Sequence, residues 1–212
     1  MIQYKDIIDR LTDEQKLALA ASLKSLALPE FAAYGIPALH HAGPHRLNAS
    51  MGGLFPPYGS AANSWDDELI GAMTGALARH AVQNSVNMIF TPKLSLKSPY
   101  REGLSEDPCL TAGYAREMAG AISAAGAMPC AGVCAMNGTD VDFADLAPDA
   151  RAIADYYTAA FDAVQGDCAV SVEYTSPGVG YETVNTKTIA DRLRGGKYSA
   201  IICERADKDK YV

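Results

Sequence analysis

Short apolar runs alternate with amphipathic segments along most of this chain. The runs that begin near residues 86, 128, 168 and 198 are consecutively apolar, which is typical of strands buried on both faces. Segments with helical spacing of polar and apolar residues lie between them, at 109–125, 148–165 and 185–194. One strand every 30 to 42 residues predicts repeated βα units and therefore a parallel sheet.

The N-terminal part of the chain is expected to be mainly helical. Residues 3–24 have apolar positions at helical spacing, and Thr12 is a candidate cap where the helix restarts. A further helix is predicted after Ser64, because the acidic residues from Asp66 onward suit the first turn of a helix. We interpret the chain as one domain, 1–212, with an N-terminal helical segment at 1–34 and βα repeats at 35–212.

Two further strands, near 36–41 and at Phe55, bring the expected number to six. The strand VNMIF at 86–90 is expected to end before Pro92, since proline cannot donate to a sheet ladder. We therefore predict an α/β fold, a TIM-barrel-like parallel barrel that is incomplete, with about six of its eight βα units. An open doubly wound sheet remains an alternative, although no GxGxxG motif follows an early strand.

Composition and charge exclude several classes of partner. Apolar residues make up 49% of the chain, which is enough for an ordinary globular core. The formal net charge of -7 argues against nucleic acid and anionic membranes as partners. No apolar run approaches the about 18 residues that a membrane span needs, and the polar N-terminus has no apolar signal segment.

The five cysteines are odd in number and lie mostly in apolar runs, which is typical of reduced thiols in the cytoplasm. We therefore expect a cytoplasmic protein. Cys130 and Cys134 are close in sequence, but no second pair of cysteines or histidines lies nearby, so no metal site is expected. Nothing in the sequence calls for a cofactor.

Residues 35–48, GIPALHHAGPHRLN, combine three histidines and an arginine with two prolines and two glycines. One hypothesis is a metal or acid–base site built from the histidines. A second is a loop whose glycines and prolines set the backbone, while the histidines pack or form hydrogen bonds. A third is direct contact of His45 or Arg46 with a ligand. The residues alone leave these three open.

Seven fragments, in one order along the chain, resemble the N-terminal domain of glycoside hydrolase family 3. That family contains β-glucosidases, β-xylosidases and β-N-acetylhexosaminidases. The fragments are RLTDEQK (10–16), GIPALHHAGPHRLN (35–48), FPPYGSAANSWDDEL (55–69), VNMIFTPKLSLKSP (86–99), SEDP (105–108), AFDAV (160–164) and YSAIICER (198–205). The resemblance implies hydrolysis of β-linked sugars by a retaining mechanism, with no cofactor and a carbohydrate as the partner.

The same resemblance implies positions for the site. The family's nucleophilic Asp aligns with Glu204, at the end of a predicted strand. The substrate-binding positions that the alignment suggests are Arg101, Lys97, Tyr174, Glu173, His41 and Arg46. The general acid is not assigned; in the family it comes from a second domain or a mobile loop. Glu173 and Asp140 are the other carboxylates near predicted strand ends.

Several family positions are replaced. The family's sugar-binding Asp before Gly-Pro is Ala42 here, and its Lys-His pair falls on Gly132 and Val133. These losses predict weak or absent turnover by this chain alone. The alternative is a catalytically degenerate relative that binds a saccharide or serves in assembly. Because a family barrel continues for two more βα units beyond Glu204, a homo-oligomer or a missing second domain is also expected.

Two residues near the helices have simpler interpretations. Asp107, in SEDP, is expected to cap the helix that follows rather than to bind sugar. Trp65, the only tryptophan, is expected to pack in the core or against the start of its helix rather than to serve as a sugar platform.

Overall fold

The computed structural model describes residues 5–21, 27–94, 97, 103–135, 155, 159–164, 166, 168–174 and 200–203. In this part of the chain every helix is too short or too polar to cross a membrane. The helix predicted at 148–165 is described only in part, through α8 (Ala159–Asp162), and the one predicted at 185–194 lies outside the described residues.

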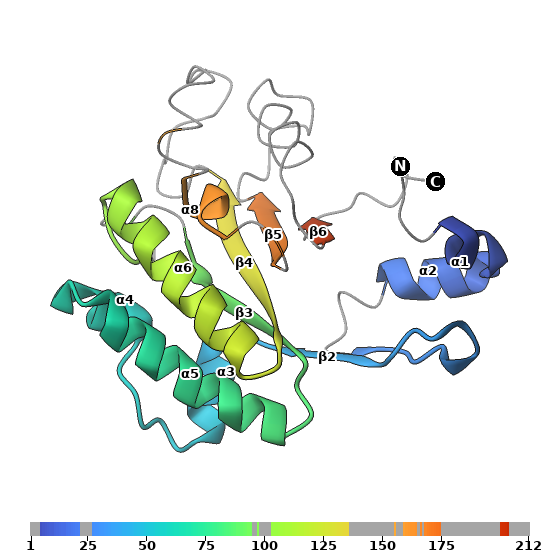
Figure 1. Ribbon diagram of the computed structural model, residues 1–212, viewed down its shortest axis with the longest axis horizontal. Coiled ribbons are helices and arrows are strands. Elements are labelled where there is room, and N and C mark those ends of the chain that lie inside the picture. The colour runs from blue at the N-terminus through green and yellow to red at the C-terminus, as the bar shows by residue number, and fades with distance from the viewer. Residues whose placement is uncertain are drawn as a thin grey trace.

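In the part of the chain that the structure describes, six strands form one sheet in the order β1-β2-β3-β4-β5-β6 (Figure 1). They are β1 (Ala27–Leu28), β2 (Leu39–Ala42), β3 (Met88–Lys93), β4 (Met128–Ala135), β5 (Ala169–Tyr174) and β6 (Ala200–Cys203). β1 runs antiparallel to β2, and each later pair of neighbours is parallel. The α/β class and the parallel sheet are confirmed, and the strands at 128–135, 168–174 and 198–203 lie where the apolar runs predict them.

The strand predicted at Phe55 is wrong. Phe55 lies in a bend, and its backbone groups are bonded by a side chain instead of a neighbouring strand. Its N–H donates to Asn48 Oδ1 at 3.0 Å, and Asn48 Nδ2 donates to its carbonyl at 2.7 Å. The Asn48 side chain thus satisfies both backbone groups of Phe55. Phe55 therefore needs no hydrogen bonds to a neighbouring strand.

The predicted end of the strand at 86–90 is also wrong, since β3 continues through Pro92 to Lys93. The pairing of β3 with β4 shifts register between Phe90, which pairs with Cys130, and Lys93, which pairs with Gly132. One additional residue on β3 therefore forms a bulge. The missing N–H of Pro92 falls within this bulge, where no ladder hydrogen bond is lost.

Two long helices cover one face of the sheet. α5 (Asp67–Gln83) and α6 (Pro108–Ala124) lie side by side in Figure 1. Each begins at an aspartate cap: Asp66 accepts the N–H of Leu69 at 2.9 Å, and Asp107 accepts that of Cys109 at 2.7 Å. The Asp107 cap was predicted, whereas Asp66 was expected in the first turn and is the cap itself. These caps satisfy N–H groups that the first turn of a helix leaves without partners.

The N-terminal helix is interrupted, as the candidate cap predicts. α1 (Lys5–Arg10) and α2 (Asp13–Ala21) are separated at Thr12, whose hydroxyl accepts the N–H of Gln15 while the Gln15 side chain accepts that of Thr12. In Figure 1 the two helices lie beside the β1–β2 extension, away from α5 and α6. Arg10 stacks over the Tyr34 ring, 5.4 Å from its centroid, in the 3-10 helix η2 (Ala32–Tyr34).

The two faces of the sheet have separate apolar clusters, so the strands are apolar on both sides. On the helix-covered face, Ile89 and Ala131 pack with buried residues of α5 and α6. On the opposite face, Met88 and Cys130 pack with Ala169 and with the partly buried Leu39, Phe90 and Met128. Consecutive residues of β3 and β4 alternate between these clusters. That alternation explains why the strand runs are apolar without a break.

Trp65 does not pack in the core, and that prediction is wrong. Its side chain is 77% exposed, and its backbone has a left-handed φ of 60°. The residue ends the 3-10 helix η3 (Ala62–Ser64) and turns the chain toward the Asp66 cap. The geometry of this turn directs the indole to solvent.

Candidate functional site

A cavity of about 560 Å³ lies at the carboxyl ends of β2 and β3, beside Gly132 of β4, and we call it the strand-end cavity. The segment after β2, the short helices α3 (Pro44–Ser50) and α4 (Tyr58–Ala61), and the end of β3 surround it. Its lining residues are Gly43, Pro44, His45, Pro57, Tyr58, Gly59, Ser60, Asn63, Phe90, Thr91, Pro92, Lys93, Lys97, Gly103, Leu104 and Gly132.

The bulge in β3 shapes the wall of the cavity. Thr91 is buried, and its hydroxyl oxygen accepts the N–H of Gly132 at 3.2 Å while it donates to the carbonyl of Pro92 at 2.9 Å. The N–H of Leu94 donates to the carbonyl of Gly132 at 2.7 Å. Both backbone groups of Gly132, its N–H and its carbonyl, are therefore hydrogen-bonded to the bulged segment Thr91–Leu94. These bonds fix the cavity wall between Thr91 and Lys93.

Two lysines reach this cavity from the same segment. Lys97, one of the predicted substrate-binding residues, donates from Nζ to Asn63 Oδ1 at 3.1 Å, and its backbone N–H donates to the carbonyl of Ser105 at 2.8 Å. Lys93 lies opposite Gly132, its partner on β4. His45 completes a set of cationic or polar donors, and none of the described lining residues is acidic.

Tyr58 contributes a neutral hydroxyl to the buried side of the cavity. Thr74 donates its only hydroxyl proton to the carbonyl of Ile70 at 2.7 Å, so the Tyr58 hydroxyl must donate in its 2.9 Å contact with Thr74. Burial raises the pKa of Tyr58 to about 12. Tyr58 therefore stays protonated at physiological pH and positions α4 against α5.

The structure separates the predicted substrate-binding residues. Lys97 lines the strand-end cavity, whereas His41 and Arg46 line a different cavity on the other side of α3. The His41 ring packs edge-on against Phe90, with centroids 5.1 Å apart. Ala42, which replaces the family's Asp, is 4% exposed and also lines that second cavity.

The remaining predicted residues are described through their backbone or not at all. Glu173 and Tyr174 are the last two residues of β5, paired with Cys134 and Ala135 of β4. Arg101 and the nucleophile position Glu204 lie outside the described residues, as does Asp140. Their roles stay predictions.

Sequence reasoning missed Lys93 and Asn63 as members of the cavity. A signal existed for Lys93, because it is the first charged residue after an apolar strand, where barrel enzymes place functional groups. Asn63 gave no such signal, since it enters the cavity only through its contact with Lys97. Among the residues that the structure describes, no group of three histidine, cysteine or acidic residues could hold a metal ion.

Comparison with solved structures shows which known folds this chain resembles. A family 3 β-glucosidase of Bifidobacterium adolescentis superposes with a TM-score of 0.61 at 21% identity, over 92% of this chain and 34% of that one. A β-glucosidase of Paenibacillus barengoltzii gives a TM-score of 0.60 at 23% identity, over 81% of this chain and 21% of that one. The chain has a divergent glycoside hydrolase family 3-like fold.

A shorter family 3 glycosyl hydrolase of Mycobacterium smegmatis matches with a TM-score of 0.58 at 15% identity, over 79% of this chain and 63% of that one. The chain spans about a third or less of the length of the two β-glucosidases. No protein-family model matches the chain, and the search of curated proteins gave no match. The likeness to family 3 is therefore one of fold.

Proposed function

We propose that this family 3-like domain binds the terminal sugar of a β-linked glycoside in the strand-end cavity and hydrolyses the bond with retention. The observation that carries the proposal is the position of the cavity, at the carboxyl ends of parallel strands, where barrel enzymes hold their active sites. Its volume of about 560 Å³ lies in the range of small-molecule sites.

Lys93 is the proposed replacement for the family's lysine, whose position falls on Gly132. The two residues are partners across β3 and β4, and a Cβ on Gly132 would lie 3.9 Å from Cδ of Lys93. The stem of Lys93 thus passes over the place where a side chain at Gly132 would begin. An amine can therefore reach sugar hydroxyls from the neighbouring strand, with Lys97 and Asn63 beside it.

The proposed carboxylate pair is Glu204 as nucleophile and Glu173 as general acid. Val172 of β5 pairs with Cys203 of β6, and each glutamate is the next residue of its chain segment. Neighbouring strands lie about 4.8 Å apart, and a retaining glycosidase needs its two carboxyl groups about 5–5.5 Å apart. Glu173 is proposed over Asp140 because it directly follows Val172, whose partner Cys203 directly precedes Glu204 in the sequence.

The chemistry divides between these two residues. The Glu204 carboxylate attacks the anomeric carbon while Glu173 protonates the leaving oxygen; water then cleaves the glycosyl–enzyme ester with Glu173 acting as base. Glutamate at the nucleophile position is one methylene longer than aspartate. A displacement of about 1 Å can cost on the order of 10²-fold in rate, so slow turnover is expected.

The test is hydrolysis of 4-nitrophenyl β-glucoside, β-xyloside and β-N-acetylglucosaminide by the purified chain. Glu204→Gln should abolish turnover, and Lys93→Met should raise KM, whereas Lys16→Met, on the exposed α2, should change neither. The double variant Lys93→Met/Gly132→Lys, which returns the amine to the family's position, should recover part of the lost affinity. Turnover that is indifferent to Glu204→Gln and Lys93→Met contradicts the assignment. Sugar binding without turnover supports the degenerate alternative instead.

A further inference from the structure

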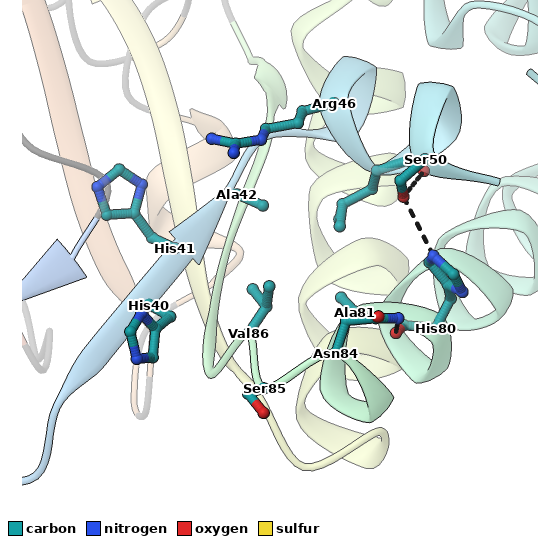
Figure 2. A pocket seen from close by; sticks show the side chains of 11 residues that line it. His40, His41, Ala42, Arg46, Ser50, His80, Ala81, Asn84, Ser85 and Val86 are labelled. Carbon is teal, nitrogen blue, oxygen red and sulfur yellow. Dashed lines mark hydrogen bonds between the residues drawn. The ribbon is translucent and has the colours of Figure 1, made fainter. Parts of the chain in front are cut away.

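A second cavity, of about 450 Å³, lies between β2, α3 and the C-terminal end of α5, and we call it the histidine cavity (Figure 2). It shares no lining residue with the strand-end cavity. Its lining residues are His40, His41, Ala42, Arg46, Leu47, Ser50, His80, Ala81, Asn84, Ser85 and Val86. The chain has four histidines, and this cavity holds all but His45.

The histidine cavity has an apolar floor and a polar rim. Ala42, Leu47 and Ala81 are each at most 5% exposed and form the floor. Arg46 and His40 are exposed, as are Ser50, Asn84 and Ser85 around the opening. Figure 2 shows the polar side chains of the rim on three elements: His40 on β2, Arg46 and Ser50 on α3, and His80 with Asn84 at the end of α5; His41 projects from the other side of β2, toward Phe90.

The Ser50–His80 contact is a donor arrangement rather than a nucleophile with its base. Ser50 Oγ donates its single proton to the carbonyl of Leu47 at 2.7 Å. His80 Nε2, 3.1 Å from the same oxygen, must therefore donate to it. Since the serine proton is directed away from the imidazole, His80 cannot act as a base toward Ser50 in this geometry. The pair orients the His80 ring at the rim.

The backbone of the histidine strand is held firmly. The N–H of His40 donates to Asn87 Oδ1 at 2.8 Å, and the N–H of Asn87 donates to the carbonyl of His40 at 2.9 Å. This fixes the position of His40 relative to Arg46, which lies four residues after Ala42. The donors of the cavity are thus arranged before any ligand enters.

The charge of this cavity differs from that of the whole protein. The chain carries a formal net charge of -7, yet none of the described residues that line the cavity is Asp or Glu. Arg46 is always protonated, and its planar guanidinium binds oxyanions through two parallel hydrogen bonds. Imidazole N–H groups add further donors, and protonated imidazoles add positive charge.

We propose that the histidine cavity is a binding site for a small phosphate monoester, separate from the glycoside site. Arg46 binds the phosphate oxygens, His40 donates a further hydrogen bond, and the uncharged organic part rests on the apolar floor. An anionic group suits the donor set, because the Arg46 guanidinium binds oxyanions through two parallel hydrogen bonds and none of the described lining residues is acidic.

The test follows the C2–H proton signals of the four imidazoles by NMR at constant pH and ionic strength. Each signal is assigned from a single His→Gln variant. Inorganic phosphate, glucose 6-phosphate and glucose are titrated separately into the full chain. The signals of His40 and His80 should shift saturably with both phosphates, glucose 6-phosphate binding more tightly, and should not respond to glucose. His45, in the strand-end cavity, is the internal control and should not shift with phosphate.

Arg46→Gln should weaken the binding of glucose 6-phosphate at least tenfold. Arg79→Gln, one residue from His80 on α5 but outside the cavity lining, is the matched control and should not. His80→Gln provides a second cavity variant if Arg46→Gln does not fold. Three results would overturn the proposal: no saturable shift up to about 50 mM phosphate, equal shifts of all four imidazoles, or equal effects of Arg46→Gln and Arg79→Gln. Binding of inorganic phosphate without glucose 6-phosphate would overturn the monoester assignment.

Discussion

His40 and Asn87 are joined by two hydrogen bonds, one through the side-chain oxygen of Asn87 and one through its backbone N–H. The amide nitrogen of Asn87 also donates to the carbonyl of Ala38 at 2.8 Å. Asn87 therefore occupies the place of a strand residue before β3 begins at Met88, and it fixes the register in which His41 pairs with Met88. Residues of β2 line the histidine cavity, and Gly43, which directly follows β2, lines the strand-end cavity. By holding β2, Asn87 therefore helps to position a wall of each cavity.

Asn87→Ala should lower the free energy of unfolding by about 1–2 kcal/mol, because it leaves the His40 N–H and the Ala38 carbonyl without protein partners. Asn84→Ala is the control, since its side chain makes one exposed hydrogen bond to the carbonyl of His80. Asn84→Ala should lower the free energy of unfolding by less than about 0.5 kcal/mol. Urea denaturation measures both. Equal losses in the two variants would mean that the Asn87 bonds do not stabilise β2.

Two buried threonines should respond in opposite ways to the same substitution. Thr91 accepts the N–H of Gly132, so Thr91→Val should leave that N–H unsatisfied and cost about 1–3 kcal/mol. The Thr111 hydroxyl is buried and has no hydrogen-bond partner among the described residues. Thr111→Val should therefore be neutral or stabilise by up to about 1 kcal/mol. Denaturation midpoints of the two variants measure these changes. A loss of stability in Thr111→Val as large as that in Thr91→Val would contradict the prediction that the two threonines respond differently.

Stability should fall at alkaline pH, and Tyr58 should account for part of the loss. The pKa of Tyr58 is about 12 in the folded chain and about 10 when unfolded, so between these values the folded state holds a proton that the unfolded state has lost. The unfolding free energy then falls as pH rises above 10, by up to about 2.7 kcal/mol near pH 12. Cys168, whose pKa burial raises to about 11, acts in the same direction from about pH 9.

The measurement is urea denaturation of the native chain and Tyr58→Phe at several pH values from 8 upward. Tyr58→Phe should be less stable than the native chain at neutral pH, because it loses the hydrogen bond to Thr74. Its stability should fall less steeply above pH 10. A variant slope as steep as the native one would show that Tyr58 does not carry the pH dependence.

Much of the fold could be predicted from the sequence where local signals and packing agree. β4 and α6 lie almost where expected, because an unbroken apolar run suits a two-sided strand and Asp107-Pro108 suits a helix start. Phe55 was misassigned because Asn48, seven residues earlier, replaces the expected strand partner. A side-chain bond of that kind leaves no pattern in apolar spacing.

The candidate site was less predictable than the fold. His41 and Lys97 come from segments that resemble one family site, yet the structure assigns them to different cavities. On α3, His45 and Arg46 are consecutive, so they point about 100° apart and enter different cavities. The approach of Lys93 to Gly132 depends on the β3 bulge. The residues Thr91-Pro92 do not by themselves predict that bulge.

Trapping the covalent intermediate tests the proposed role of Glu204 as the nucleophile of a retaining glycoside hydrolase. In 2,4-dinitrophenyl 2-deoxy-2-fluoro-β-glucoside the fluorine slows formation and hydrolysis of the glycosyl–enzyme, while the dinitrophenolate leaves without a general acid. We expect a mass increase of one deoxyfluoroglucosyl group, located by peptide mapping on Glu204 and absent from Glu204→Gln. A folded chain that gains no adduct, or gains it at another residue, would contradict the assignment of Glu204 as the nucleophile.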